Sequence, residues 1–186
     1  MKVRGAAFPI RDMIITAMFT AILCVVAPFS ISIGQIPLTL ATLIIYLTAG
    51  LFGWKYGVIS VGLYVLLGAI GIPVFTNFEG GFHKIAGVTG GYIIGYIPCA
   101  LVIGRINGAS GNKRYNSLTY AFGMVIGTAL LYTCGTAWFT FQTGGSVATA
   151  LALCVVPFLI GDTIKIVLAC IIAPKLRSAL SRSVRN

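Results

Sequence analysis

The chain has 186 residues, of which 58% are hydrophobic and only 9% are charged. Because a soluble domain carries about 25% charged residues, this chain has too few to cover a water-facing surface and is predicted to be an integral membrane protein. The formal net charge of +10 does not indicate a nucleic-acid partner, since the basic residues lie in the tails and at the edges of apolar runs rather than on one face.

Six apolar runs predict an all-α membrane protein, a bundle of six transmembrane helices with structured outer loops. The runs cover residues 13–33, 38–53, 56–70, 89–104, 118–138 and 148–173. A helix needs about 20 residues to span a membrane, so the second, third and fourth runs are short and predict re-entrant segments beside them. Residues 1–186 leave no room for a separate soluble domain, and we expect a single membrane domain.

The distribution of lysine and arginine predicts which side of the membrane each loop faces. If the N-terminal segment of about residues 1–12 is cytoplasmic, the inner segments hold all but two of the 13 basic residues. The two others are Lys84, in an outer loop, and Lys165, inside the last run. Because positively charged loops stay on the cytoplasmic side, the N-terminal segment and the tail of about 175–186 are both predicted to be cytoplasmic.

The outer segments 30–37 and 71–87 are rich in turn-forming and polar residues. Loops with many polar and turn-forming residues on one side of the membrane, above short helices, indicate a pocket that opens to the outside. The second of these segments contains Asn77, Glu79 and the only histidine, His83. We interpret Glu79 and His83 as solvated loop residues, because a lone histidine without a cluster of acids or cysteines is a weak catalytic or metal signal.

Asp162 and Lys165 are the strongest functional signal, because they interrupt a run that is otherwise apolar from residue 147 to residue 173. A charge at this depth costs at least a few kcal/mol unless it is paired or hydrated. Their spacing of three residues places both side chains on one face of a helix. We interpret the pair as an acceptor and a donor for a ligand, and a purely structural ion pair is the alternative. Pro157 predicts a kink in the same helix.

The sequence contains no recognisable enzyme motif. The five cysteines are scattered through apolar runs, and we find no nucleophile–base pair, metal-ligand spacing or phosphate-binding loop. We therefore expect neither catalysis nor a bound metal or cofactor.

Ala17 and Ala21, in the first run, have the small-xxx-small spacing that lets helices approach closely. That spacing is compatible with packing inside the chain and with a partner helix.

Six stretches spread over nearly the whole chain carry longer motifs. They are QIPLT at residues 35–39, GLFG at 50–53, YVLLGAIGIPVF at 64–75, TGGYIIGY at 89–96, GTAWF at 135–139 and PFLIGDTIK at 157–165. Together they resemble the BioY family, the biotin-specific substrate-binding subunits of energy-coupling factor transporters. The chain departs from the family pattern at Val88, where the family usually has proline, and at Ala41, where it often has glutamine.

The resemblance implies a six-helix bundle that captures biotin on its outer side for ATP-driven uptake across a bacterial cell membrane. Biotin would be the transported ligand rather than a cofactor. The resemblance and the chemistry of biotin together suggest the substrate-binding residues Asn77, Thr89, Gly91, Tyr92, Asp162 and Lys165. The carboxylate among them can accept from the ureido N–H groups, and the ammonium can donate to the ureido oxygen or to the carboxylate of biotin.

The resemblance also implies partners. Ala17 and Ala21 match the first-helix pattern at which such subunits dock to a transmembrane coupling protein, which in turn connects to cytoplasmic ATPase subunits. Membrane lipid would surround the rest of the bundle. Two alternatives stay open: a subunit of the same type for another vitamin, such as thiamine or riboflavin, and a stand-alone channel or proton-coupled carrier that uses Asp162 as a relay.

Overall fold

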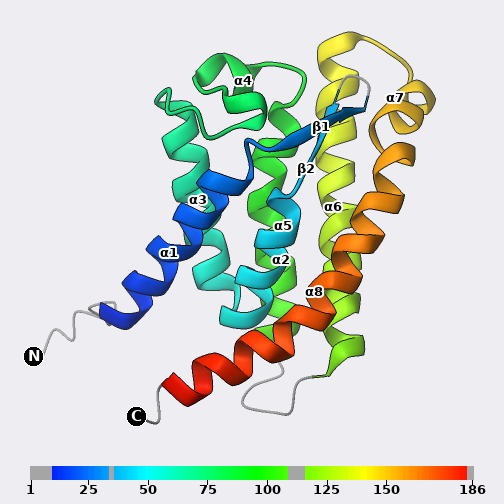
Figure 1. Cartoon of the computed structure of the whole chain (residues 1–186). Coiled ribbons are helices and arrows are strands. Elements are labelled where there is room, and N and C mark those ends of the chain that lie inside the picture. The colour runs from blue at the N-terminus through cyan, green and yellow to red at the C-terminus, as the bar shows by residue number, and fades with distance from the viewer. Residues whose placement is uncertain (1–9, 34–35, 109–115, 184–186) are drawn as a thin grey trace, which may run out of the picture.

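The computed structural model describes residues 10–33, 36–108 and 116–183. Figure 1 shows a bundle of helices with a short β-hairpin and two small helices, α4 and α7, at its upper end. The first described helix begins, and the last one ends, at the opposite, lower end. Five basic residues counted in the orientation prediction lie outside the described residues: Lys2, Arg4, Lys113, Arg114 and Arg185.

The described part of the chain contains eight α-helices, one 3-10 helix and two strands. In chain order they are α1 (Ile10–Val26), β1 (Ser30–Ile33), β2 (Ile36–Thr39), α2 (Ala41–Phe52), α3 (Trp54–Ala69), η1 (Thr76–Phe78), α4 (Phe82–Ala86), α5 (Gly90–Gly108), α6 (Ser117–Thr143), α7 (Val147–Cys154) and α8 (Val156–Ser183). The prediction of an all-α class is confirmed in its main feature, since the two strands form only the single antiparallel hairpin.

The first apolar run does not form one helix. Helix α1 ends at Val26, and residues 30–33 form strand β1, which pairs with β2 so that Ser30 lies opposite Thr39. Pro28 has no N–H with which to continue the helix, and the alternation of serine and isoleucine from residue 30 to residue 33 has the period of a strand. The prediction of a helix over 13–33 was therefore too long, because it counted apolar residues and ignored their period.

The last apolar run is also divided. Helix α7 ends at Cys154 and α8 begins at Val156, so Pro157 lies in the first turn of a new helix rather than in the middle of an old one. A proline there removes an N–H that would have no helical partner anyway. The interruption predicted from Pro157 is therefore a break between two helices at Val155 rather than a kink within one helix. Helix α8 contains Pro174 instead and continues to Ser183, and Figure 1 shows its last part turning away from the direction of its first part.

Glycines let α5 and α6 pack closely. A side chain at Gly91 would meet Cβ of Trp138 at 2.2 Å, and one at Gly127 would meet the side chain of Ile103 at 2.5 Å. Small residues allow helices to approach where no hydrophobic effect drives them together. The glycines at these two positions are thus explained by packing within the chain.

Within the described residues, two helices are long and apolar enough to cross a membrane, namely α6 over Ser117–Thr143 and α8 over Val156–Ser178. Helices α1, α2 and α3 are apolar but shorter. Large apolar side chains are exposed on the outside of the bundle, among them Leu118, Phe122 and Ile160. A surface of this kind is suited to contact with lipid chains rather than water.

Candidate ligand-binding site

Asp162 and Lys165 lie on the first half of α8 and are both buried, each with 5% of its surface exposed. The Nζ atom of Lys165 lies 2.8 Å from Oδ1 of Asp162, so the two charges form an ion pair across less than one turn of the helix. The predicted sharing of one helix face is confirmed. A buried pair of this kind persists only if the remaining hydrogen-bonding capacity of both groups is also satisfied.

Two other helices supply further partners for the pair. Tyr132 of α6 donates its hydroxyl to Oδ2 of Asp162 at 2.5 Å. Thr42 of α2 donates to Oδ1 of the same carboxylate at 3.3 Å and accepts from Lys165 Nζ at 3.0 Å. The carboxylate therefore accepts hydrogen bonds from three side chains on three helices. Charge-assisted bonds of this type are shorter and stronger than neutral ones, so the cluster holds α2, α6 and α8 in a fixed relation.

The sequence analysis missed both Thr42 and Tyr132. Each is a polar side chain inside an apolar run, which is a weak signal because threonine and tyrosine are common in membrane helices. Only the packing of α2 and α6 against α8 turns these two hydroxyls toward Asp162.

The ion pair lies in the wall of a cavity beneath the hairpin. The polar part of this wall consists of Thr39, Thr42, Thr76, Thr89, Tyr132, Asp162 and Lys165. Most of the remaining wall is aromatic and comes from Tyr64, Phe75, Tyr92, Tyr96 and Phe158. A largely apolar cavity with a few convergent polar groups is the usual form of a small-molecule site.

The aromatic wall is held in place by specific contacts. The rings of Tyr64 and Phe75 meet edge to face with their centroids 5.5 Å apart. Tyr92 donates its hydroxyl to the carbonyl of Cys154 at 3.0 Å, which satisfies a backbone group at the end of α7. The ring of Tyr92 also packs against Gly135, where any side chain would collide with it at 2.3 Å. These rings are therefore preorganised before a ligand enters.

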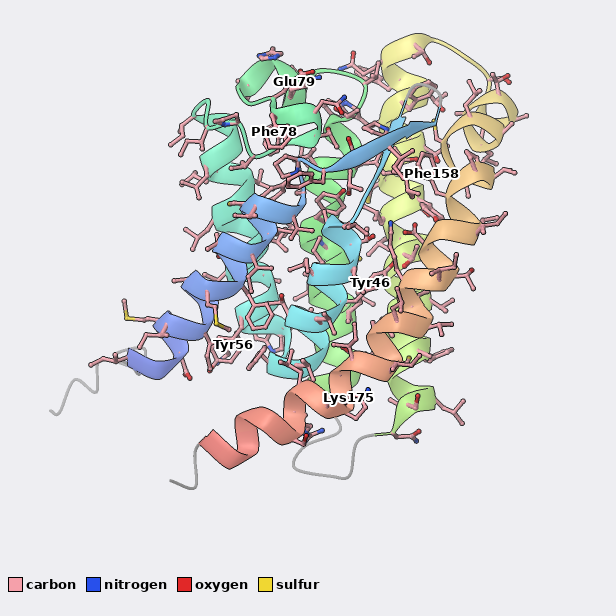
Figure 2. The ribbon with its side chains drawn as sticks, in the orientation of Figure 1. Tyr46, Tyr56, Phe78, Glu79, Phe158 and Lys175 are labelled. Carbon is pink, nitrogen blue, oxygen red and sulfur yellow. The ribbon has the colours of Figure 1, made fainter. Side chains whose placement is uncertain are left out.

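The loop that contains Asn77 is docked onto the hairpin. The backbone N–H of Asn77 donates to the carbonyl of Pro28 at 3.0 Å, and its side-chain Oδ1 accepts from the Ser30 hydroxyl at 2.8 Å. Asn77 has a φ of 61°, a left-handed conformation that asparagine adopts more readily than most residues. The neighbouring Phe78, labelled in Figure 2, packs edge to face on Phe29. Asn77 and Lys165 both line a second hollow beside the main cavity.

The chain matches the BioY family model over residues 1–182. It belongs to the BioY family. A protein of Thermotoga maritima named biotin transporter BioY is 38% identical over 167 residues, covering 90% of this chain and 96% of the relative. A probable biotin transporter BioY of Pyrococcus horikoshii is also 38% identical with the same coverage. Lactococcus lactis has a biotin transporter BioY2 that is 34% identical over 168 residues.

A crystal structure at 2.1 Å of the S-component for biotin from an ECF-type ABC transporter has the same fold. It superposes with a TM-score of 0.82 at 28% sequence identity, and the match covers 96% of this chain and 95% of that one. These relatives are transporters or a transporter component. This BioY chain is accordingly a membrane protein of a family whose named relatives are transporters.

The structure of the BioY chain brings four of the six predicted site residues together. Thr89, Tyr92, Asp162 and Lys165 line one cavity. Asn77 lies outside it, in the adjoining hollow that it shares with Lys165. Gly91 is not among the cavity-lining residues and instead packs against Trp138, whose Nε1 donates to the carbonyl of Gly87 at 2.9 Å. Gly91 is thus placed in the α5–α6 contact, one residue away from the ring of Tyr92.

Ala17 and Ala21 lie on the exposed face of α1, away from the cavity. The opposite face of the same helix is buried through Phe19 and Leu23. The two alanines therefore do not serve close packing within the described part of the chain. The small-xxx-small motif is left available to a partner or to lipid.

Proposed function

We propose that this BioY chain is the substrate-binding subunit of an energy-coupling factor transporter and that it captures biotin at the outer face of the membrane. The observation that carries this proposal is the buried Asp162–Lys165 pair in the wall of an aromatic cavity. The names of the relatives and of the structural neighbour support biotin as the ligand and an ECF-type assembly as the setting.

The polar groups of biotin match the hydrogen-bonding capacity that Asp162 and Lys165 do not use within the protein. Among the described residues, Tyr132 alone donates to Asp162 Oδ2, so this oxygen can accept another hydrogen bond from a ureido N–H. The ammonium of Lys165 donates to Asp162 and to Thr42 and has a third N–H for the ureido oxygen. The fused rings would then lie against the aromatic wall, and the carboxylate tail would extend toward the hollow at Asn77.

For the topology, we propose six membrane spans in one domain, formed by α1, α2, α3, α5, α6 and α8. The hairpin, α4 and α7 would lie at the outer surface of the bacterial cell membrane. The start of α1 and the end of α8 share the opposite end of the bundle, which supports cytoplasmic positions for both termini. The lysine and arginine distribution supports the same orientation.

Ala17 and Ala21 are proposed to dock the transmembrane coupling protein, through which the chain would engage cytoplasmic ATPases. Their exposed position on α1 supports this role. Replacing either by tryptophan should abolish association with the coupling protein in a co-purification assay and leave biotin binding intact. Ala129→Trp, at an exposed position on α6, is the matched control and should still associate. Loss of biotin binding in the Ala17 or Ala21 variants would instead assign this face to the bundle core.

Calorimetric titration of the purified protein with biotin tests the ligand assignment. We expect nanomolar affinity that is independent of a proton gradient, and much weaker binding of an analogue without the ureido group, because that analogue leaves buried polar groups unpaired. Thiamine and riboflavin should not compete. Binding of either of these vitamins in place of biotin would assign the chain to another substrate. Biotin binding no tighter than micromolar would overturn the proposal.

A further inference from the structure

The lower end of the bundle carries a cluster of one tryptophan and two cations, formed by Trp54, Lys55 and Arg105. The Nζ atom of Lys55 lies 5.8 Å from the centroid of the Trp54 ring, and the guanidinium carbon of Arg105 lies 5.4 Å from it. All three residues are exposed, Trp54 to 39%. Gly104 packs so closely on the Trp54 backbone that any side chain there would lie 2.3 Å from its Cα atom. The helix ends that carry the cluster are thus held rigidly together.

The two cations of this Trp54 cluster have no carboxylate partner among the described residues. The chain has three acidic residues in all. Glu79 pairs with Lys84, Asp162 pairs with Lys165, and Asp12 accepts the hydroxyl hydrogen bond of Tyr56. Two like charges drawn to one ring repel each other, and an external anion between them removes that repulsion.

We infer that the Trp54 cluster binds the phosphate group of an anionic phospholipid. Tryptophan is enriched at the level of lipid headgroups, and arginine and lysine are the side chains that recognise phosphate. Basic residues near the membrane surface attract anionic lipid in proportion to their number. Lys175, labelled at the same end in Figure 2, and Arg177 are also exposed there and add to the local positive potential. The assignment to the inner leaflet rests on the proposed orientation.

The chain has two tryptophans, which makes the test direct. Trp138→Phe leaves Trp54 as the only indole, and its fluorescence in vesicles is quenched by brominated lipid that lies against it. Brominated phosphatidylglycerol and brominated phosphatidylcholine are compared at equal mole fraction in otherwise identical vesicles. We expect the anionic lipid to be preferred about fivefold at Trp54, and Lys55→Gln or Arg105→Gln to reduce the preference to about twofold or less.

Arg177→Gln is the matched control, because it removes a positive charge from the same end but not one of the two cations over the ring. It should reduce the preference less than Lys55→Gln or Arg105→Gln does, because it lowers only the general surface potential. Equal quenching by both lipids, or an equal loss in all three variants, would overturn the site and leave only a general surface potential. Loss of the preference with millimolar inorganic phosphate at constant ionic strength would identify a site for free phosphate instead. Equal quenching together with loss of coupling-protein association in Lys55→Gln would assign the cluster to a protein partner.

Biotin binding is measured on the same vesicles, so the two proposals fail separately. A protein that binds biotin without preferring anionic lipid disproves only the lipid site. A protein that prefers anionic lipid but does not bind biotin disproves only the proposed ligand.

Discussion

The described part of the chain contains two ion pairs that differ in their surroundings. In the segment between α3 and α5, Lys84 and Glu79 have side chains that are 27% and 42% exposed. In α8, the side chains of Lys165 and Asp162 are only 6% and 7% exposed. Lys165 also donates a hydrogen bond to Thr42, and Asp162 also accepts one from Thr42 and one from Tyr132 of α6. Exposed pairs contribute little because water competes with them, whereas a buried charge left without its partner is costly. The comparison explains why only the α8 pair is interpreted as a binding site.

Removing one member of the buried pair should have the largest effect. Lys165→Met leaves Asp162 buried without its cation, and we expect a loss of about 3–5 kcal/mol of stability. Asp162→Asn should act in the same direction. Each variant should also weaken biotin binding at least tenfold, about 1.4 kcal/mol, because a ligand contact is lost. Thermal unfolding and calorimetric titration measure the two effects. Normal biotin binding in both variants would show that the pair is structural.

The double variant Asp162→Asn with Lys165→Met separates stability from function. With no unpaired charge left in the interior, stability should recover by about 1–4 kcal/mol relative to the less stable single variant. Biotin binding should stay lost, since neither the acceptor nor the donor is restored. If binding returns together with stability, the pair acts through the fold rather than by touching the ligand.

Tyr132→Phe tests whether the hydroxyl group that donates to Asp162 contributes to biotin affinity. Its loss removes a hydrogen bond to a charged group, so we expect biotin affinity to fall roughly tenfold, or about 1.4 kcal/mol. Tyr46→Phe is the control, because that hydroxyl is also buried but pairs with Thr128 rather than with the carboxylate. Equal losses of affinity in the two variants would mean that the effect comes from packing in general.

Breaking the exposed pair should have the smallest effect. For Lys84→Ala and Glu79→Gln we expect stability changes of about 0–1 kcal/mol, and these should shrink further at high salt. Biotin affinity should change by less than about twofold, since neither residue lines the cavity. A tenfold loss in either variant would remove the distinction between the two pairs and bring the segment between α3 and α5 into the site.

Several features of this protein could be predicted from local properties of the sequence. The scarcity of charge indicates a membrane protein, and the spacing of Asp162 and Lys165 places them on one face, because solvation cost and helical period act within a short segment. The motifs that resemble the BioY family are likewise contiguous stretches. These features need no knowledge of which helix lies beside which.

Tertiary structure decided the rest. Thr42 and Tyr132 reach Asp162 only because α2 and α6 pack against α8, and no spacing in the sequence indicates that meeting of distant segments. The same holds for Gly91, which packs on Trp138 rather than lining the cavity. Pro157 indicates an interruption of the last run, but only the structure shows that the run divides into two separate helices at Val155. Local sequence does not distinguish one polar side chain in an apolar helix from another. The packing of distant helices therefore determined which polar groups surround the charged pair.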